Sequence, residues 1–204
     1  MLTPRKLPAQ ARSAATVEAL RCAAVQVLTG EGLDRCTTTR IAERAGTSVG
    51  SLYQYYPNRD ALLSEVLERR LDATACAVEG ACLAHRGGSA VEMARALAAA
   101  FLSMKLSEPE KSKALYTVAQ ELGAVAMIDR LRTRVIAAVE IMLVSASDAR
   151  FDDPAGVATV AFGAMAGTVR ILLEGQSPAQ LETRLENELA LLLTAYFRER
   201  QAKC

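Results

Sequence analysis

Apolar residues recur every three or four positions along most of the chain, which is the spacing of one buried face of a helix. The first such stretch begins after Ser13. It ends at Gly30 and Gly32, and glycine is typical of helix C-termini. The apolar positions of this predicted helix are Val17, Leu20, Ala24, Val27 and Leu28.

The next helix starts are marked by polar side chains, which can accept hydrogen bonds from the free backbone N–H groups of a first turn. They are Thr37 or Thr38 before a short helix that Gly46 stops, Ser48 before a short helix to about Tyr55, and Asn58 before a longer helix from Arg59. The glycines at 80, 87 and 88 indicate a break. Beyond them we predict helices over about 89–106, 109–122, 127–145, 154–174 and 178–200, three of which start at a proline.

The composition agrees with a helical fold. Alanine and leucine dominate, aromatic residues make up 4% and tryptophan is absent, whereas long valine and isoleucine runs are missing. The longest uncharged stretch, residues 154–169, is shorter than the roughly 20 apolar residues of a membrane span, so we interpret it as a packing helix. The fold class predicted is therefore all-α, with about nine helices.

Charge is unevenly distributed although the formal net charge is only +1. Residues 1–59 hold eight basic and four acidic residues, or +4, and the remainder holds 16 and 19, or −3. A basic module on a mildly acidic body suits one face that meets phosphate. The five cysteines show no metal-like spacing, and we expect reduced thiols, no metal, no cofactor and a cytoplasmic protein.

Residues 38–56 read TTRIAERAGTSVGSLYQYY, two short predicted helices around a tight turn at Gly46 and Thr47. Such a pair crosses steeply, and its second helix can enter a DNA major groove about 12 Å wide. The apolar positions that lock the pair together are Ile41, Ala42, Ala45, Val49 and Leu52. The side chains left outside this small core are Ser48, Gly50, Ser51, Tyr53, Gln54 and Tyr55, which suit phosphates and base edges.

Three of the five tyrosines fall at positions 53, 55 and 56. Densely spaced tyrosines in a core would need buried hydroxyl partners, whereas phosphate oxygens supply such partners on a DNA-facing helix. We expect Tyr56 to pack inside the domain. Free N–H groups at the starts of the helices at Thr38 and Asn58 offer further phosphate sites, the second reinforced by Arg59.

The segment TTRIAERAG–TSVGSLYQYYPNRDALL, with its GEGLDRCT lead-in, resembles the DNA-binding domain of the TetR (tetracycline-repressor-like) family over about residues 13–72. The resemblance implies a flexible basic arm over 1–12, a three-helix helix-turn-helix domain over 13–60, and a C-terminal ligand-binding and dimerisation domain over 61–204. It also implies a homodimeric repressor that binds palindromic operator DNA and responds to a small-molecule effector.

The resemblance assigns roles to individual positions of the helix-turn-helix. Phosphate contacts are implied for Thr38, Arg40, Tyr53, Tyr55 and Arg59, and base contacts for Ser48, Val49, Gly50 and Ser51, with Gln54 exposed beside them. This chain departs from the family pattern in two places. Tyr55 stands where several members have His, and Val49 where many have Lys or Gln, so the base sequence recognised cannot be transferred.

The last two predicted helices carry more apolar circumference than one neighbouring helix covers, with small residues that allow close approach. Packing against the same pair of a second subunit would form a four-helix bundle, which is how TetR-like proteins dimerise. The alternative is that both helices are internal core. The predicted interface residues are Val160, Gly163, Ala164, Gly167, Ile171, Leu181, Leu185, Leu189, Leu192 and Tyr196.

The effector pocket has no clear signal in the sequence. By family likeness it lies among the middle helices, where an apolar lining favours a lipophilic effector, although each such residue is more often plain core. The candidate lining residues are Phe101, Met104, Tyr116, Gln120, Met142, Phe162 and Met165.

Two other interpretations stay open. A thiol-sensing regulator could use Cys36, which precedes the motif, although burial and inertness fit it better. A helical RNA-binding or adaptor protein without an effector would leave the clustered tyrosines and hydroxyls unexplained. An enzyme is disfavoured, because the sequence holds neither a nucleophile motif nor a phosphate loop, and a single histidine leaves little for base catalysis. The effector, the operator and the sign of regulation remain open.

Overall fold

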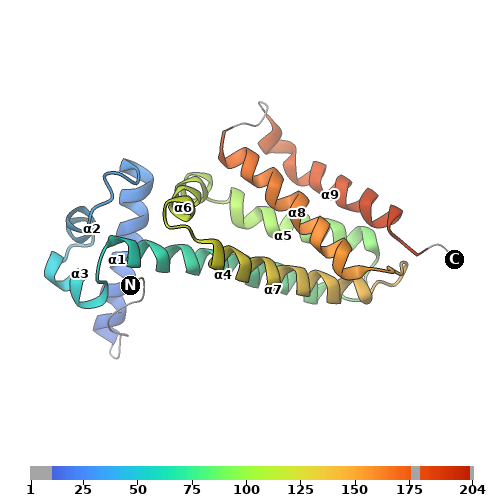
Figure 1. The fold of residues 1–204 in the computed structure, drawn as a ribbon, viewed down its shortest axis with the longest axis horizontal. Coiled ribbons are helices and arrows are strands. Elements are labelled where there is room, and N and C mark those ends of the chain that lie inside the picture. The colour runs from blue at the N-terminus through green and yellow to red at the C-terminus, as the bar shows by residue number, and fades with distance from the viewer. Residues whose placement is uncertain (1–10, 176–179, 203–204) are drawn as a thin grey trace. The chain divides into compact units, whose positions relative to one another are not determined.

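The structure, a computed structural model, describes residues 11–175 and 180–202. Over these ranges the chain forms nine helices (Figure 1), and one isolated antiparallel bridge between Phe151 and Gln201 is the single β interaction. The all-α prediction is confirmed. The helices are α1 Ala11–Glu31, α2 Thr38–Arg44, α3 Val49–Tyr55, α4 Arg59–Ala84, α5 Ala90–Leu106, α6 Pro109–Glu121, α7 Val125–Val144, α8 Pro154–Leu173 and α9 Leu181–Glu199.

Local hydrogen bonds set the helix starts that the sequence predicted. The Thr37 side chain caps α2 and Ser48 caps α3, each accepting a hydrogen bond from a backbone N–H three residues on. The Asn58 side chain accepts from the N–H of Ala61 at 2.8 Å in the first turn of α4. Pro109 and Pro154 begin α6 and α8, whereas Pro178 and residues 1–10 of the predicted arm lie outside the described residues.

The break predicted from Gly80 is wrong, because α4 continues through this glycine to Ala84. Val78 and Cys82 on either side of Gly80 are buried, and their packing holds the helix together across it. The turn comes later, at Gly87, whose φ of +75° is a conformation that glycine adopts without strain. Ser89 and Glu92 then form a reciprocal capping box that starts α5.

Two compact units make up the chain. Unit 1 comprises the residues up to Arg70 together with Glu110–Val125, and unit 2 comprises Leu71–Pro109 together with Ala126–Cys204. The units do not coincide with the domains expected over residues 13–60 and 61–204. Those domain boundaries stay a prediction. Unit 1 thus contains α1, α2, α3, the first part of α4, and α6, and its buried residues include Leu20, Ile41, Leu52 and Leu62.

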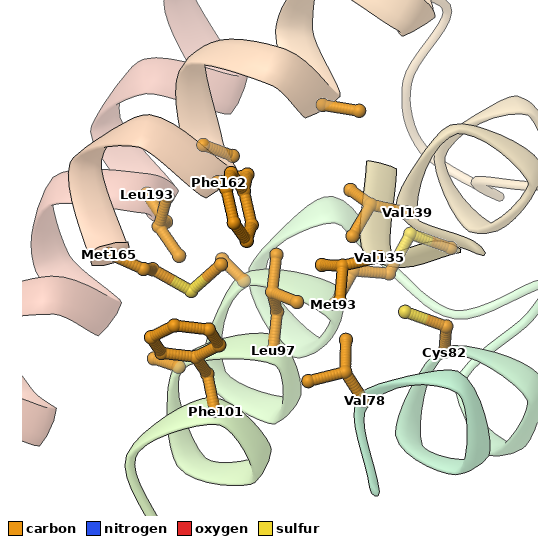
Figure 2. Close-up of a cluster of buried hydrophobic side chains, with 14 of the residues drawn as sticks. Val78, Cys82, Met93, Leu97, Phe101, Val135, Val139, Phe162, Met165 and Leu193 are labelled. Carbon is orange, nitrogen blue, oxygen red and sulfur yellow. The ribbon is translucent and has the colours of Figure 1, made fainter. Parts of the chain in front are cut away.

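Unit 2 is built around α5, which packs against α8 and most extensively against α9. Its core is a single apolar cluster from the second part of α4 and from α5, α7, α8 and α9. Figure 2 shows Leu97 and Met93 of α5 at the centre of this cluster. Phe101 and Phe162 meet edge to face with ring centroids 6.2 Å apart, which joins α5 to α8.

Helix α8 is long and apolar enough to cross a membrane by length and composition, as is true of many core helices. In unit 2 one of its faces is buried, including Val157, Phe162 and Met165. This burial agrees with the packing helix predicted from the sequence.

Candidate nucleic-acid interface

Helices α2 and α3 pack against each other through a small apolar core in unit 1. Ile41, Ala42 and Leu52 are almost completely buried there. The chain turns between the helices at Gly46, with a φ of +65°, and the N–H of Thr47 donates to the carbonyl of Ala42 at 3.0 Å. This turn fixes the angle between the two helices and leaves one side of α3 facing away from the small core.

The outward side of α3 presents hydroxyl, amide and glycine groups. Ser48, Gly50 and Gln54 are exposed, Ser51 and Val49 are half-buried, and the side chain of Tyr53 is 43% exposed. The Ser48 hydroxyl accepts a hydrogen bond from the N–H of Ser51 at 3.0 Å, and the two serine hydroxyls lie 2.9 Å apart. Six of the predicted contact residues are therefore brought together on one accessible surface.

Tyr53 also lies close to the start of α2. Its phenol oxygen is 3.4 Å from the Thr38 hydroxyl, a long and weak contact between two exposed groups. Both hydroxyls therefore remain available to a stronger acceptor such as a phosphate oxygen. The structure places these two predicted phosphate ligands side by side, although they come from different helices.

Tyr55 corrects the sequence-based expectation. Its side chain is only 9% exposed, so it belongs to the buried side of α3 and not to the outward surface. Position 55 lies three residues after Leu52, which puts both residues on the same face of the helix. Tyr56 is completely buried, as predicted.

Tyr56 lies next to charged groups that come from distant parts of the sequence. Arg21 of α1 donates to Glu65 of α4 at 2.6 Å and also pairs with Glu18. Burial raises the pKa of the Tyr56 phenol and the Glu65 carboxylate raises it further, whereas Arg21 opposes this. The Arg21–Glu65 pair ties α1 to α4 across 44 positions of sequence, a separation that leaves no local signal.

The two predicted phosphate-binding arginines already have partners in unit 1. Arg40 of α2 forms an ion pair with Glu31 at the end of α1. Arg59 donates from Nε to Asp60 at 2.8 Å and from Nη1 to the carbonyl of Leu33 at 3.4 Å. Any phosphate would have to compete with these groups, although Arg40 keeps 44% of its side chain exposed.

Cys36, the residue of the thiol-sensing alternative, is fully buried beside α1. Its thiol donates weakly to the carbonyl of Ala24 at 3.9 Å. Burial raises the pKa of this thiol to about 11, against a smaller opposite effect of Arg59. The reactive thiolate is therefore scarce at neutral pH, which argues against Cys36 as a sensor.

The predicted dimer residues of α8 lie on an exposed face of unit 2. Val160 and Ile171 are 52% and 46% exposed, and Gly163 and Gly167 are also exposed, with open space where a Cβ atom would stand. Because 160 and 171 are about three helical turns apart, these residues form one stripe along α8.

On α9 the predicted seam is partly wrong. Leu185 and Leu189 are buried in the core of unit 2, together with Leu193 and Phe197. Leu192 is 48% exposed, Leu191 is 67% exposed, and Leu181 and Tyr196 are half-buried. Because leucine fills positions 191, 192 and 193, the pattern alone did not indicate which face turns inward.

The candidate effector residues do not all belong to one unit. Phe101, Met142, Phe162 and Met165 are buried in the core of unit 2, and Met104 of α5 is half-buried. Tyr116 and Gln120 lie on α6 and belong to unit 1, where the first is half-buried and the second exposed. Within the described ranges no group of three or more His, Cys, Asp and Glu side chains is placed to hold a metal ion.

Comparisons with known proteins cover both units. Residues 20–66 match the profile of bacterial regulatory proteins of the tetR family, and residues 90–197 match that of the tetracyclin repressor-like C-terminal domain. The uncharacterized HTH-type transcriptional regulator YvdT of Bacillus subtilis is 33% identical over 58 residues, which is 28% of this chain. That match spans only 30% of the YvdT chain.

Solved structures resemble the chain over nearly its whole length. A protein from Mesorhizobium loti MAFF303099, named as a TetR-family transcriptional regulator, superimposes with a TM-score of 0.77 and 17% identity. The match covers 95% of this chain and 100% of that one. A transcriptional regulator from Rhodococcus sp. Rha1 gives a TM-score of 0.70 and 18% identity, over 92% of this chain and 99% of that one. At these identities the likeness concerns the fold.

Proposed function

The chain belongs to the TetR family of bacterial transcriptional regulators, and from this premise we propose that it is a homodimeric repressor of palindromic operator DNA. A small lipophilic effector binds unit 2 and releases the DNA. The observation that carries the proposal is the outward surface of α3, where exposed hydroxyl, amide and glycine groups lie on a short helix that a tight turn fixes.

Gly50 supports a DNA-facing role for α3. Glycine inside a helix costs roughly 0.5–1 kcal/mol relative to alanine. A Cβ atom at position 50 would meet only the Ser48 hydroxyl, at an ordinary 3.7 Å, so the fold itself does not require glycine here. A close approach of the helix backbone to a groove gives the glycine a function.

The proposed phosphate ligands surround this helix. Thr38 and Tyr53 form a pair of exposed hydroxyls, and Arg40 and Arg59 supply charge after they exchange Glu31 and Asp60 for phosphate. Ser48, Val49, Gly50, Ser51 and Gln54 form the surface proposed to meet the bases. Phosphate contacts position the protein on the duplex, and base contacts give sequence specificity.

Dimerisation is proposed through α8 and α9. Val160 and Ile171 on α8 and Leu191 and Leu192 on α9 expose large apolar side chains on helices that pack side by side in unit 2 (Figure 1). Burying these faces against a second copy would remove apolar surface from water and hold two reading helices about one DNA turn apart.

The effector is proposed to be lipophilic because the core of unit 2 is apolar. The rings of Phe101 and Phe162 and the thioether of Met165 face one another in it (Figure 2), and flexible methionine repacks readily around a guest molecule. An effector releases DNA only if it binds more tightly to the conformation that does not fit the operator. A protein with this activity works in the cytoplasm, where bacterial DNA lies.

Selection from a random duplex library, followed by fluorescence anisotropy at several salt concentrations, tests the DNA-binding part. We expect one enriched palindrome, nanomolar affinity and a steep loss of affinity with salt. Equal affinity for all duplexes would refute specific binding. Thermal shifts with a panel of hydrophobic compounds, repeated with the selected duplex, test the effector. A compound that stabilises the free protein should weaken the DNA complex.

A further inference from the structure

The surface of α3 that faces away from the protein carries no charged side chain. From Thr47 to Tyr55 the sequence reads TSVGSLYQY, and the exposed or half-buried positions hold hydroxyls, one amide, one glycine and one valine. Guanine is most often read in the major groove by arginine or lysine, which bond its O6 and N7 together. This helix has no group that can do so.

The two serine hydroxyls near the start of α3 bond to each other, which uses part of their hydrogen-bonding capacity. Ser48 accepts the N–H of Ser51, and the two hydroxyls lie within hydrogen-bond distance of each other. The side-chain amide of Gln54, by contrast, is exposed and bonds no other group among the described residues. A glutamine amide can bond N6 and N7 of adenine together, which makes Gln54 the strongest polar reader on the helix.

Val49 gives the start of the helix an apolar contact surface. Its side chain is half-buried at the first position of α3, and Gly50 beside it adds no side chain of its own. The apolar feature of the major groove is the C5-methyl group of thymine, which small apolar side chains contact. The major-groove edges of guanine and cytosine carry no methyl group that the valine side chain could contact.

Two arginines close in sequence to α3 are held by other groups, whereas Arg44 at the end of α2 is exposed. Arg40 of α2 pairs with Glu31, and Arg59 of α4 bonds Asp60 and the carbonyl of Leu33. Both arginines stand on α2 and α4, outside the base-facing surface of α3, and we assign them to the phosphate backbone, which can replace their carboxylate partners. Within the base-facing surface of α3, we therefore assign the strongest discrimination to Val49 and Gln54.

We propose that this protein reads A·T base pairs at the centre of each half-site, with Val49 on thymine methyl groups and Gln54 on adenine. The inference rests on the proposed function, since it names the class of DNA that the same surface recognises. It assigns specificity to one methyl contact and one amide, and it requires no guanine contact from α3.

The test starts with the full-length protein and a random 30-base-pair duplex library, and then uses the selected duplex as the probe. Each thymine of the half-site is replaced by deoxyuridine, which lacks only the methyl group. At the thymine that Val49 contacts, we expect the affinity to fall about three- to fivefold, the value of one buried methyl group. Deoxyuridine at other thymines should change the affinity little.

Val49→Ala and Tyr53→Phe form a matched pair of variants. Val49→Ala should bind the thymine and deoxyuridine duplexes with nearly equal affinity, because the methyl contact is gone. Tyr53→Phe should bind both more weakly but keep the thymine preference, because its hydroxyl is assigned to phosphate. Alanine is also the better helix former, so Val49→Ala retains α3.

Three outcomes would be informative. A selected A·T-rich half-site whose thymine preference disappears in Val49→Ala supports the inference. A guanine-centred half-site, or a thymine preference that survives in Val49→Ala, overturns it while specific DNA binding stands. A library without any enriched sequence overturns the proposed function, and the inference with it.

Discussion

The side chains of Tyr53, Tyr55 and Tyr56 lie in different environments, although they are almost adjacent in the sequence. Tyr53 is 43% exposed and its hydroxyl meets Thr38, whereas Tyr55 and Tyr56 are buried. The density of tyrosines predicted that Tyr53 and Tyr55 both face outward, which holds for Tyr53 and is wrong for Tyr55. The helical period distinguishes the faces once Leu52 is fixed as core, because Tyr55 follows it by three positions and Tyr53 by one.

Replacing Tyr53 by Phe should weaken operator binding by about 1 kcal/mol, or roughly fivefold in Kd, because one hydrogen bond to phosphate is lost. The loss should be the same for different duplex sequences, and fluorescence anisotropy measures it. The unfolding transition should barely move, since the contact with Thr38 is long. Tyr55→Phe is the matched control and should bind DNA like the original chain. Unchanged affinity of Tyr53→Phe would remove Tyr53 from the phosphate surface.

The buried thiol of Cys36 should make folding sensitive to alkaline pH. Its pKa rises from an ordinary 9.0 to about 11 in the folded chain. Between these values the unfolded chain loses the proton and the folded chain keeps it, so the free energy of unfolding falls as the pH rises. The loss should be about 3 kcal/mol at most, once the pH exceeds both values.

Urea unfolding of the original chain and of Cys36→Ala, at several pH values from about 7.5 to 10.5, measures this effect. Alanine removes the titrating group and leaves Cys82, the buried thiol of unit 2, as an internal control. The two stability curves should approach each other as the pH rises. Parallel curves would mean that the thiol of Cys36 ionises equally easily in the folded and unfolded chain.

At the scale of the elements, most starts of helices could be predicted because their signals are local. Thr37, Ser48 and Asn58 each bond a backbone N–H within the next three residues, and Pro109 and Pro154 stand in first turns. Gly80 misled the prediction because its conformation depends on packing. The buried neighbours of this glycine hold the helix, and a sequence window does not reveal burial.

Replacing Gly80 by Ala should stabilise the protein by roughly 0.5–1 kcal/mol. The residue lies inside α4, and a Cβ atom there would meet open space, so only the helix preference of alanine counts. Denaturant unfolding measures the gain, and DNA affinity should not change. Gly87→Ala is the contrasting variant. It should be destabilising, because position 87 has a φ of +75°. A destabilised Gly80→Ala would show that this turn of α4 is strained.

At the scale of the whole molecule, the sequence predicted which helices carry the site but not every face. The apolar positions shared by α2 and α3 predicted which side of α3 faces outward. All residues predicted on that side are accessible except Tyr55. Long-range pairs such as Arg21–Glu65 leave no trace in a periodic pattern. The sequence also did not indicate which face of α9 turns toward the core. Three consecutive leucines satisfy two faces equally, and only the packing of unit 2 selects one.

The exposed stripe of α8 provides the decisive test of the proposed dimer. Ile171→Glu places a charge on this stripe, where it costs little in a monomer because the side chain is 46% exposed. Buried against a second copy, an unpaired carboxylate would cost about 3–5 kcal/mol, more than a hundredfold in the dimer dissociation constant. Sedimentation should therefore detect monomers with an unchanged circular dichroism spectrum.

Leu83→Glu, on an exposed leucine at the end of α4, is the matched control and should remain dimeric. Loss of the dimer also has a consequence for DNA binding, because two linked reading helices bind a palindrome with a high effective concentration that a monomer lacks. Ile171→Glu should thus bind a full operator and a half-site almost equally, with a correspondingly shallower salt dependence. A dimeric Ile171→Glu beside a monomeric Leu83→Glu would move the interface from α8 to the end of α4.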